Sequence, residues 1–398
     1  MLNRFLLKIN SLKIGIVEIC EANHYTAVEA LAYTYATAKE NKITVFTLQK
    51  FKENFQFKHP QIEVITPKTE DLSPFLNLIN NFGLDRIHIN TIDKYYQKFA
   101  QVNWNAVLIL TVHNTNIWFN NSLSKRWDLL LEKLRKTNLS KLKNTFYLPI
   151  KYFVKDFKKQ QHINQLVNQI ILRNGVFLVY SDAQKQYLLS LNARLNILVF
   201  PFCIHQNLED LSKNNKKLRI CVPGSVDESR RDYHLLIEVL KNNQSFFNER
   251  VSVDFLGYIS KDNQEILKHI LALEANGLTV FYNQGFINHT QFDERLQACD
   301  IILGNLKVNI NSQSKYGETK ETGVIFNMIK AAKPGVFPSS YQPLKELENA
   351  CLFYNDNLFE TLQILVLNPS IINNLKNNIK EAVKEFEPLN LYQKLIKP

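Results

Sequence analysis

The sequence has 398 residues, of which 45% are hydrophobic and 21% charged, and its formal net charge is +11. This composition is typical of a globular protein and excludes a disordered one, and the length favours two domains that each bury a core. No stretch reaches the roughly 18 apolar residues of a membrane-spanning helix. A secretory signal is not expected either, because Lys8 and Lys13 interrupt the apolar N-terminus and no small-residue cleavage site follows.

The first half of the chain predicts alternating strands and helices. Apolar strands are expected at 13–19, 43–48, 62–65, 86–89, 107–112, 175–180 and 197–201, and helical spacing occurs at 26–40 and 72–82. Near-continuous apolar strands separated by helices predict a parallel sheet that is covered on both faces.

A basic segment at 125–159 interrupts this alternation. It contains eleven Lys or Arg and three Asp or Glu, a net charge of +8, with leucines and aromatic residues interleaved. Basic amphipathic helices of this kind bind anionic membrane surfaces, each Lys or Arg contributing on the order of 1 kcal/mol. The alternatives are a core-facing apolar stripe with a solvated basic face, and a nucleic-acid patch. Nucleic acid is not expected as a partner because no recognition motif accompanies the charge.

The alternation restarts after a polar linker that we expect at 205–217. Strands are expected at 218–222, 251–256, 278–282, 301–303, 336–337 and 351–354, and helices at 233–242, 261–276, 289–297 and 371–386. We therefore expect domains at 1–204 and 218–370, with an insertion at 117–162 in the first domain and a last segment at 371–398. Two doubly wound domains in series form a cleft where ligands bind beyond the strand ends.

The five cysteines give information on the redox compartment. They are scattered, odd in number and never spaced as CxxC, at Cys20, Cys203, Cys221, Cys299 and Cys351. This pattern favours reduced thiols in a cytoplasmic protein and argues against a disulfide framework or a zinc site. A DxD-type metal motif is also absent, since Asp254, Asp293 and Asp300 are isolated, so no metal site is expected.

Polar residues follow two predicted strands of the first domain. Glu21, Asn23 and His24 lie between the first strand and the first helix, and His113 follows the strand at 107–112. Such positions face the ligand in a doubly wound domain, where a histidine can donate to an oxygen or take a proton near neutral pH. The alternative is that residues at a helix start only cap it. The loop lacks G-x-G-x-x-G, so a dinucleotide cofactor is not expected.

The second domain opens with a strand followed by a glycine turn and two arginines. Gly224 permits close approach of a ligand, Ser225 follows it, and the guanidinium groups of Arg230 and Arg231 can bind phosphate oxygens in bidentate fashion. The layout therefore predicts diphosphate binding, although the P-loop pattern GxxxxGK[ST] is absent. Alternatively, one arginine only pairs with a neighbouring aspartate.

A second phosphate-binding candidate is the segment YGETKETGVIFNMIKAAKPGVFP at 316–338. Glu318, Lys320 and Glu321 lie in a polar loop, and a helix is expected to begin at Thr322 and Gly323. The free N–H groups and positive end of a helix can hold a phosphate while nearby carboxylates meet hydroxyls. The segment predicts a phosphorylated, hydroxyl-rich ligand such as a nucleotide sugar. An ordinary surface connection is the alternative.

The order of these pieces resembles a GT-B glycosyltransferase and is most similar to the large family-4-type group of nucleotide-sugar-dependent enzymes. The resemblance covers nearly the whole chain. It is carried by His113, by Gly224 with the two arginines, and by the Glu-rich loop before AAKPGVFP. In that family an Arg and then a Lys follow the glycine loop and hold the donor diphosphate. Here Ser225 occupies the Arg place, and Arg230 or Arg231 matches the Lys.

The glutamate pair of that family is not intact in this chain. The family has two glutamates eight positions apart, the second of them seven residues before a proline. Counting back from Pro334 leads to Asn327 and Thr319, and the latter is flanked by Glu318 and Glu321. We expect Asn327 to hydrogen-bond a donor hydroxyl, and Glu318 and Glu321 to compete for one catalytic role.

The resemblance implies acceptor binding by the first domain, donor binding by the second, and a last segment that packs back on the first domain. The residues implied are His113, Glu318 and Glu321 for catalysis, Gly224, Ser225, Arg230, Arg231, Lys320, Thr322, Gly323 and Asn327 for the donor, and Glu21, Asn23 and His24 for the acceptor. The implied enzyme is a retaining hexosyltransferase that uses a nucleoside-diphosphate sugar and no cofactor. Its acceptor would be a glycan or a lipid-linked sugar at the inner membrane face, in cell-surface polysaccharide synthesis.

The stereochemical mechanism and the functional class of the protein each have alternatives. Arginines, Lys320 and a helix end can stabilise a departing diphosphate without a metal. An inverting enzyme would need a positioned base, for which Glu21, His24 and His113 are candidates, whereas a retaining enzyme could use the donor phosphate. The alternatives to a transferase are a nucleotide-sugar 2-epimerase and a non-catalytic GT-B-like binding or scaffold protein.

Overall fold

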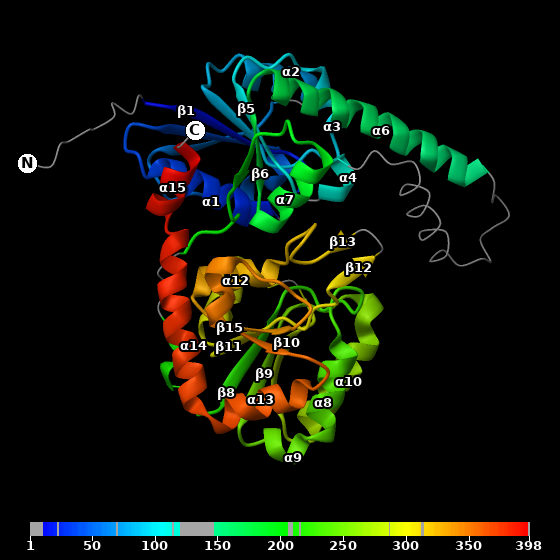
Figure 1. Cartoon of the computed structure of the whole chain (residues 1–398), viewed down its shortest axis with the longest axis vertical. Helices are drawn as coiled ribbons and strands as arrows, with labels where there is room; N and C mark the ends of the chain where they lie inside the picture. The colour runs from blue at the N-terminus through cyan, green and yellow to red at the C-terminus, as the bar shows by residue number, and fades with distance from the viewer. Residues whose placement is uncertain are drawn as a thin grey trace, which may run out of the picture. The chain divides into compact units, whose positions relative to one another are not determined.

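The computed structural model describes residues 11–21, 24–68, 71–113, 115–119, 147–205, 210–214, 216–285, 287–311 and 314–396, with side chains of the long helix at 147–172 described from Phe157 on. The chain divides into two compact units. The first unit comprises Met1–Phe202 and Leu391–Pro398, and the second comprises Cys203–Asn390. Figure 1 shows a sheet flanked by helices in each unit.

The first unit is built on a seven-stranded parallel sheet with the order β3-β2-β1-β4-β5-β6-β7. The strands are β1 (Lys13–Glu18), β2 (Lys42–Thr47), β3 (Ile62–Ile65), β4 (Arg86–Ile89), β5 (Val107–Thr111), β6 (Val176–Val179) and β7 (Ile197–Val199). The helices are α1 (Tyr25–Ala36), α2 (Leu72–Asn80), α3 (Tyr96–Gln101), α4 (Thr115–Phe119), α6 (Tyr147–Leu172), α7 (Asp182–Leu191) and α15 (Pro388–Ile396), with the 3-10 turn η2 (Gln49–Asn54). Because the central strands are buried on both faces, their sequences are almost entirely apolar.

The core of the first unit also contains polar side chains that are bonded to one another. Trp104 is fully buried against Phe99 and donates its indole N–H to the Phe99 carbonyl at 3.1 Å. His88 lies 2.8 Å from the Tyr35 hydroxyl, and burial lowers the pKa of His88 to about 3, so the ring is neutral. The ring of Tyr392 in α15 packs edge-on against Tyr35. The last helix therefore completes this part of the core.

The second unit has a six-stranded parallel sheet with the order β10-β9-β8-β11-β14-β15. The strands are β8 (Leu218–Pro223), β9 (Val251–Tyr258), β10 (Thr279–Asn283), β11 (Ile301–Leu303), β14 (Gly335–Pro338) and β15 (Cys351–Tyr354), and a separate antiparallel hairpin joins β12 (Asn309–Asn311) and β13 (Ser314–Lys315). The helices are α8 (Tyr233–Asn242), α9 (Gln244–Phe247), α10 (Gln264–Ala275), α11 (His289–Gln297), α12 (Gly323–Ala331), α13 (Leu358–Leu367) and α14 (Pro369–Ala382). The 3-10 turns are η4 (Leu211–Asn214), η5 (Lys261–Asn263), η6 (Lys345–Ala350) and η7 (Val383–Phe386).

Two helices of this unit position the candidate donor residues. Helix α8 begins at an Asp232 cap that accepts the Leu235 N–H at 3.0 Å, and it buries Tyr233, Leu236, Ile237 and Leu240 at helical spacing. Each of these side chains contributes ~1.5–3 kcal/mol by burial, so Arg231 directly before the cap has a fixed place. Helix α12 ends at Ala332, which has a left-handed φ of 49°, and Pro334 cannot continue it.

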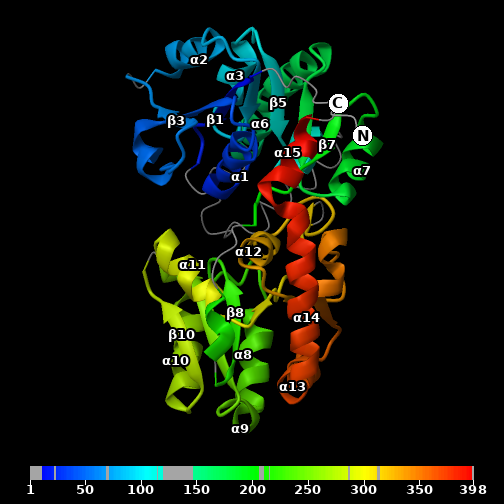
Figure 2. The same ribbon diagram turned by 90° about the vertical axis from the view of Figure 1, so that its left-hand side faces the viewer.

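The predicted doubly wound α/β architecture with two parallel sheets is confirmed. The predicted helix at 371–386 is α14 followed by η7, and Figure 2 shows α14 lying along the second unit. The residues from Leu391 on group with the first unit, where the Tyr392 hydroxyl accepts from Asn41 at 3.3 Å and the Leu395 carbonyl accepts from Arg86 at 3.2 Å. All five cysteines are buried, and none of them takes part in a disulfide.

Part of the expected linker at 205–217 is ordered against the second unit. Residues 211–214 form η4, and Asp210 accepts from the buried Lys333 ammonium at 2.6 Å. Of the basic segment at 125–159, the part before Tyr147 lies outside the described residues, and the part after it belongs to α6. Among the helices described, none is both long enough and apolar enough to cross a membrane.

Candidate functional site

In the first unit, polar side chains meet at the carboxyl ends of four neighbouring strands. Glu18 ends β1, Asn90 and Thr91 follow β4, His113 follows β5 and Tyr180 follows β6. Because carboxyl ends of parallel strands share one edge of the sheet, residues up to 162 positions apart come together there.

Glu18 is the centre of this cluster. Its side chain is 0% exposed, and each carboxylate oxygen accepts two hydrogen bonds. Oε1 accepts the backbone N–H groups of Cys20 at 2.8 Å and Glu21 at 3.0 Å, and Oε2 accepts Asn90 Nδ2 at 2.6 Å and the Thr91 hydroxyl at 2.7 Å. Burial alone would raise the pKa of Glu18, but the hydrogen bond and charge of His24, followed by the Glu21 and Thr91 donors, lower it, so the carboxylate is ionised.

His24 lies beside this carboxylate. Its Nδ1 is 2.8 Å from Thr91 Oγ1 and 3.5 Å from Glu18 Oε2, and its side chain is 25% exposed. The imidazole stacks on that of His113 with 4.3 Å between ring centroids and 6° between planes. Burial would lower the pKa of His24, but the hydrogen bond and charge of Glu18 outweigh it, so the pKa is raised.

His113 is held by two partners within the first unit. Its Nε2 lies 2.8 Å from the Asn90 carbonyl oxygen, and its Nδ1 is hydrogen-bonded to the Tyr180 hydroxyl. The structure brings His113 and His24 together, although β4 lies between the strands β1 and β5 that precede them. Glu21 is half-exposed and lies 3.9 Å from Lys94. Asn23 lies outside the described residues.

In the second unit, Gly224 forms the turn after β8. Its φ of 96° favours glycine, and a Cβ atom there would lie 2.8 Å from Nη2 of Arg231. A Cβ atom on the neighbouring Gly257 would lie only 2.0 Å from the Gly224 carbonyl oxygen. The two glycines therefore let the turn pack closely on β9 and on Arg231.

The two arginines of the predicted pair have different environments. Arg231 is 8% exposed, and its Nη1 donates to the Pro223 carbonyl beneath the Gly224 turn. The Arg230 side chain is 61% exposed and lies 3.6 Å from Asp227, while Ser225 is exposed. Arg231 thus has the fixed position of a preorganised binding group, whereas the Arg230 side chain is open to solvent.

The loop after β11 adds a third cation to this end of the sheet. Lys307 donates its backbone N–H to the Arg230 carbonyl at 3.0 Å, and its ammonium contacts Glu228 Oε1 at 2.7 Å. Tyr316 joins this loop to the segment before α12. Burial raises the pKa of its hydroxyl, which is within electrostatic reach of both arginines and of Glu321.

Helix α12 begins as the sequence predicted, with Thr322 as its cap. The Thr322 hydroxyl accepts the Val324 N–H at 3.3 Å, and a Cβ atom on Gly323 would meet no other atom within 4 Å. The first turn of the helix is therefore open on the Gly323 side. The positive end of a helix is suited to bind an anion.

Glu321 is buried directly before this helix. It is 7% exposed, and its Oε1 accepts the Tyr341 hydroxyl at 2.6 Å and the Thr322 N–H at 2.9 Å. Burial raises the pKa of Glu321 to about 7, and the two hydrogen bonds only partly oppose this. Near neutral pH the side chain exists in both protonation states, as is common for functional carboxyl groups.

The other residues expected in this loop are placed differently from Glu321. Glu318 is exposed and pairs with Lys315 at 3.1 Å. Lys320 is half-buried, and its carbonyl accepts the Gly317 N–H at 2.9 Å. Asn327 lies half-buried one turn into α12. Of the two competing glutamates, Glu321 is thus the one fixed beside the helix start.

Sequence reasoning missed several members of both clusters. Glu18 ends an apolar strand and Thr91 follows another. The only feature of the sequence that could have indicated a role for them in a site is a polar residue at the end of an apolar strand. Tyr341, which holds Glu321, lies after β14 and carried no motif. The Asp254 carboxylate is not available to a metal ion, because it is fully buried and already pairs with Arg219, at 2.6 Å, and with Arg295. Among the described residues, no group of three or more His, Cys, Asp or Glu could hold a metal ion.

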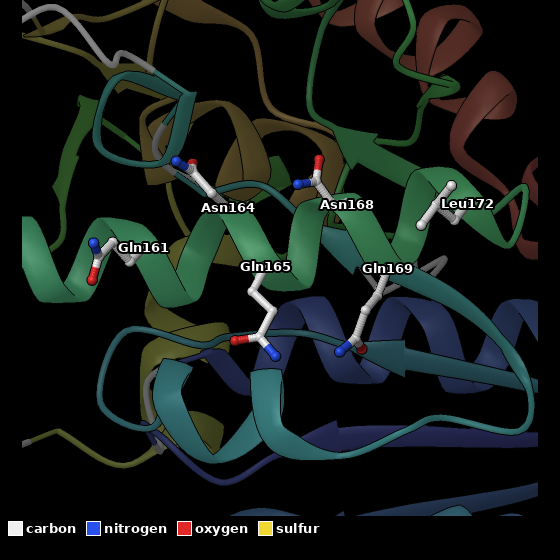
Figure 3. Close-up of a pocket in the computed structure, with 6 residues that line it drawn as sticks. All are labelled: Gln161, Asn164, Gln165, Asn168, Gln169 and Leu172. Atoms are coloured by element: carbon white, nitrogen blue, oxygen red, sulfur yellow. The ribbon is translucent and has the colours of Figure 1, made fainter.

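A surface depression of about 580 Å³ lies on α6 and is lined by Gln161, Asn164, Gln165, Asn168, Gln169 and Leu172. Figure 3 shows that Asn164 and Asn168 point to one side of the helix and Gln165 and Gln169 to the other. Gln169 is engaged with the Ala100 carbonyl at 2.9 Å. All lining residues come from one helix, so the depression lacks the converging groups of the two strand-end clusters.

The sequence matches no protein-family model and no curated protein. The structure, however, is similar to solved glycosyltransferases. HepE from Anabaena, solved with UDP and glucose, has a TM-score of 0.59 at 14% identity over 96% of this chain and 98% of that one. A glycosyltransferase from Rickettsia africae gives 0.58 at 14% identity over 98% and 100%.

A third similar structure is the pneumococcal O-GlcNAc transferase GtfA in complex with UDP and GlcNAc, with a TM-score of 0.56 at 9% identity over 97% of this chain and 98% of that one. At such identities the likeness establishes the fold and not the activity. Membership of the family-4-type group stays a prediction. The two parallel-sheet units and these matches over nearly full length show that the chain has the GT-B fold.

Proposed function

We propose that this protein is a glycosyltransferase that moves a hexose from a nucleoside-diphosphate sugar to a glycan or lipid-linked acceptor. The observation that carries the proposal is the arrangement at the strand ends of the second unit. There, Arg231 is fixed beneath the Gly224 turn, and the open start of α12 at Gly323 belongs to the same group of loops. The similar structures solved with UDP support the choice of donor.

The chemistry of sugar transfer explains why these groups would be needed. Breaking the bond between the sugar and the diphosphate leaves negative charge on the departing phosphate. Guanidinium groups and helix N–H groups that already point to that position stabilise the charge without reorganisation. Arg231, the exposed Arg230 and the start of α12 can supply this stabilisation, so we propose that no metal is required.

We propose that the first unit binds the acceptor through Glu21 and His24, with the ring of His113 stacked on that of His24. Their side chains lie at one edge of a parallel sheet, which is where ligands bind in folds of this kind. The resemblance to family-4-type enzymes implies retention of the anomeric configuration, and proton NMR of the fresh product measures it.

The donor site is tested by titrating UDP and GDP into the wild-type protein and three variants. Arg231→Ala should weaken binding of the preferred nucleotide by ~10- to 100-fold, because a charge-assisted hydrogen bond is worth about 1.5–3 kcal/mol. Arg230→Ala should have a smaller effect. Arg250→Ala is the matched control, since Arg250 precedes β9 at the opposite edge of the same sheet. Unchanged affinity in both Arg230→Ala and Arg231→Ala would refute the assignment.

A non-catalytic binding protein is the alternative that one observation favours. Thr319 and Asn327 stand where the similar family has its two glutamates, and Glu318 is exposed to solvent. Incubation with a panel of UDP-, GDP-, ADP- and dTDP-sugars and simple acceptors distinguishes a transferase from a non-catalytic binding protein. Tight nucleotide binding with neither transfer nor donor hydrolysis would favour the binding protein.

We also propose that the protein works in cell-surface polysaccharide synthesis at the cytoplasmic membrane face, held there by the basic segment 125–159. Its net charge of +8 with interleaved apolar residues supports binding to anionic lipid. The protein should sediment with anionic vesicles in low salt and be released in high salt. Recovery in the supernatant with and without vesicles would contradict this.

A further inference from the structure

We propose that Glu18 and Thr91 are positioning residues that keep the ring hydrogen of His24 on Nδ1 and present Nε2 to a hydroxyl group of the acceptor. The inference rests on the proposed function for the identity of the ligand. It follows from three steps: the direction of the hydrogen bonds, the contrast with His113, and the charges that face the ring.

The direction of the hydrogen bonds is fixed by the carboxylate. Glu18 is ionised and can only accept, so the Thr91 hydroxyl, 2.7 Å from Oε2, must donate its single hydrogen to it. Thr91 Oγ1 can then only accept in its 2.8 Å contact with His24 Nδ1. Nδ1 therefore carries a hydrogen in the neutral ring as well as in the charged one, and the lone pair of the neutral ring is on Nε2.

His113 has the opposite arrangement. Its Nε2 faces the Asn90 carbonyl, which has no hydrogen to give, so Nε2 is the protonated nitrogen. Its Nδ1 is hydrogen-bonded to the Tyr180 hydroxyl. Both nitrogens of His113 are thus engaged by the first unit itself. In the part of the chain that the structure describes, Nε2 of His24 has no hydrogen-bond partner, and the ring is partly exposed. Of the two stacked rings, His24 is the one able to bind a ligand.

The surrounding charges favour a proton on His24. Glu18 from β1, Glu21 from the following loop and Asp93 from the loop after β4 act on it with negative charge. Lys94 donates to the Cys20 carbonyl and lies 3.9 Å from Glu21, and the ring of His113 stacks on that of His24. Below its pKa, His24 donates from Nε2 to a hydroxyl oxygen, and above it Nε2 accepts from the hydroxyl.

If Glu18 only held the loop before His24 in shape, removing the Thr91 hydroxyl should leave the His24 tautomer unchanged. Through Oε1 Glu18 also holds the Cys20 and Glu21 N–H groups, which shapes the loop before His24. Thr91→Val removes only the hydroxyl between Oε2 and His24 and leaves this loop contact intact. Thr91→Ser restores the hydroxyl. The two Thr91 variants therefore show whether the His24 ring is positioned by the Thr91 hydroxyl or whether Glu18 acts only through the loop before His24.

The direct test is nitrogen-15 NMR of the imidazole rings in the full chain, at a pH above the pKa of His24, with His24→Gln used to assign the signals. Wild-type and Thr91→Ser should show His24 protonated at Nδ1, and Thr91→Val and Glu18→Gln should lose this preference. An unchanged tautomer in both Thr91→Val and Glu18→Gln would overturn the inference. This measurement needs neither donor nor acceptor, so it decides the positioning even if the proposed function fails.

Kinetics test the link to the acceptor. Thr91→Val should lower kcat/KM for the acceptor by about tenfold while UDP affinity stays within twofold of wild type, and Thr91→Ser should recover most of the loss. Glu18→Gln should also move the acid limb of the pH–rate profile to lower pH, because the carboxylate raises the pKa of His24. Full acceptor kinetics in Thr91→Val would overturn the acceptor role. Absence of transfer by wild type with every donor would instead refute the proposed function.

Discussion

Replacing Glu321 by glutamine should stabilise the protein at pH 8 and have little effect at pH 5. The carboxyl group is 7% exposed, and burial raises its pKa from 4.5 to about 7. Between these values the folded state keeps a proton that the unfolded state loses, so stability falls as pH rises through this window. The shift corresponds to about 3 kcal/mol at pH 8 and to less than about 1 kcal/mol at pH 5. Glutamine has no proton to lose and can still accept from Tyr341 and Thr322.

Unfolding by urea at both pH values measures the effect. Trp104 is fully buried in the core of the first unit, so its fluorescence follows that unit. Circular dichroism follows both units, and the change should appear only in the transition that tryptophan fluorescence does not report. Glu318→Gln is the matched control, because it removes the same charge from an exposed position of the same loop.

A stability gain of Glu321→Gln that is equal at pH 5 and pH 8 would refute the reasoning, because it would show that the proton on Glu321 does not differ between the folded and unfolded states. A loss of stability at pH 8 would refute it as well. It would mean that the hydrogen bonds from Tyr341 and Thr322 require the charged group.

Three further outcomes follow from the packing. Gly224→Ala should lower nucleotide affinity at least tenfold in a binding titration, because the added Cβ lies 2.8 Å from Arg231 Nη2 and the φ of 96° disfavours alanine; unchanged affinity would contradict this. Trp104→Ala should cost about 3–5 kcal/mol in the unfolding of the first unit only, as seen by comparing the two transitions in calorimetry. Asp254→Asn should destabilise the second unit by ~3–5 kcal/mol, because Arg219 and Arg295 lose their buried partner, and a change below about 1 kcal/mol in urea unfolding would show the cluster to be unimportant.

The sequence predicted the elements that burial dictates. All six parallel strands of the second unit were expected, since each is an apolar run whose side chains must leave water on both faces. The hairpin of β12 and β13 was not expected. Its strands have three and two residues, and its polar sequence NINSQSK is too short to show a period of two. Helix α1 was expected to reach residue 40 and ends at Ala36.

Some residues of the candidate sites could likewise be predicted from the sequence, and others could not. Gly224, Arg231 and the start of α12 could be proposed from local sequence, because a turn glycine, adjacent arginines and a helix cap have meaning by themselves. The cluster around Glu18 could not, since Asn90 and Thr91 lie 72 and 73 residues away and only the strand order β1-β4-β5 makes them neighbours. Among the described residues, Glu18, Glu21 and Asp93 raise the pKa of His24, and of these only Glu21 lies in the same loop.

The position of α15 has a consequence for synthesis on the ribosome. Residues up to Phe202 emerge first, but Tyr392, which covers Tyr35 and bonds to Asn41, follows only after the whole of the second unit. At translation rates of about 5–20 residues per second this delay is roughly 10–40 s. During that time the Tyr35–His88 pair lacks its packing contact with Tyr392, so the core of the first unit is incomplete while the second unit is synthesised. A nascent chain held before Leu391 should therefore be cleaved by protease in the first unit more readily than the released protein.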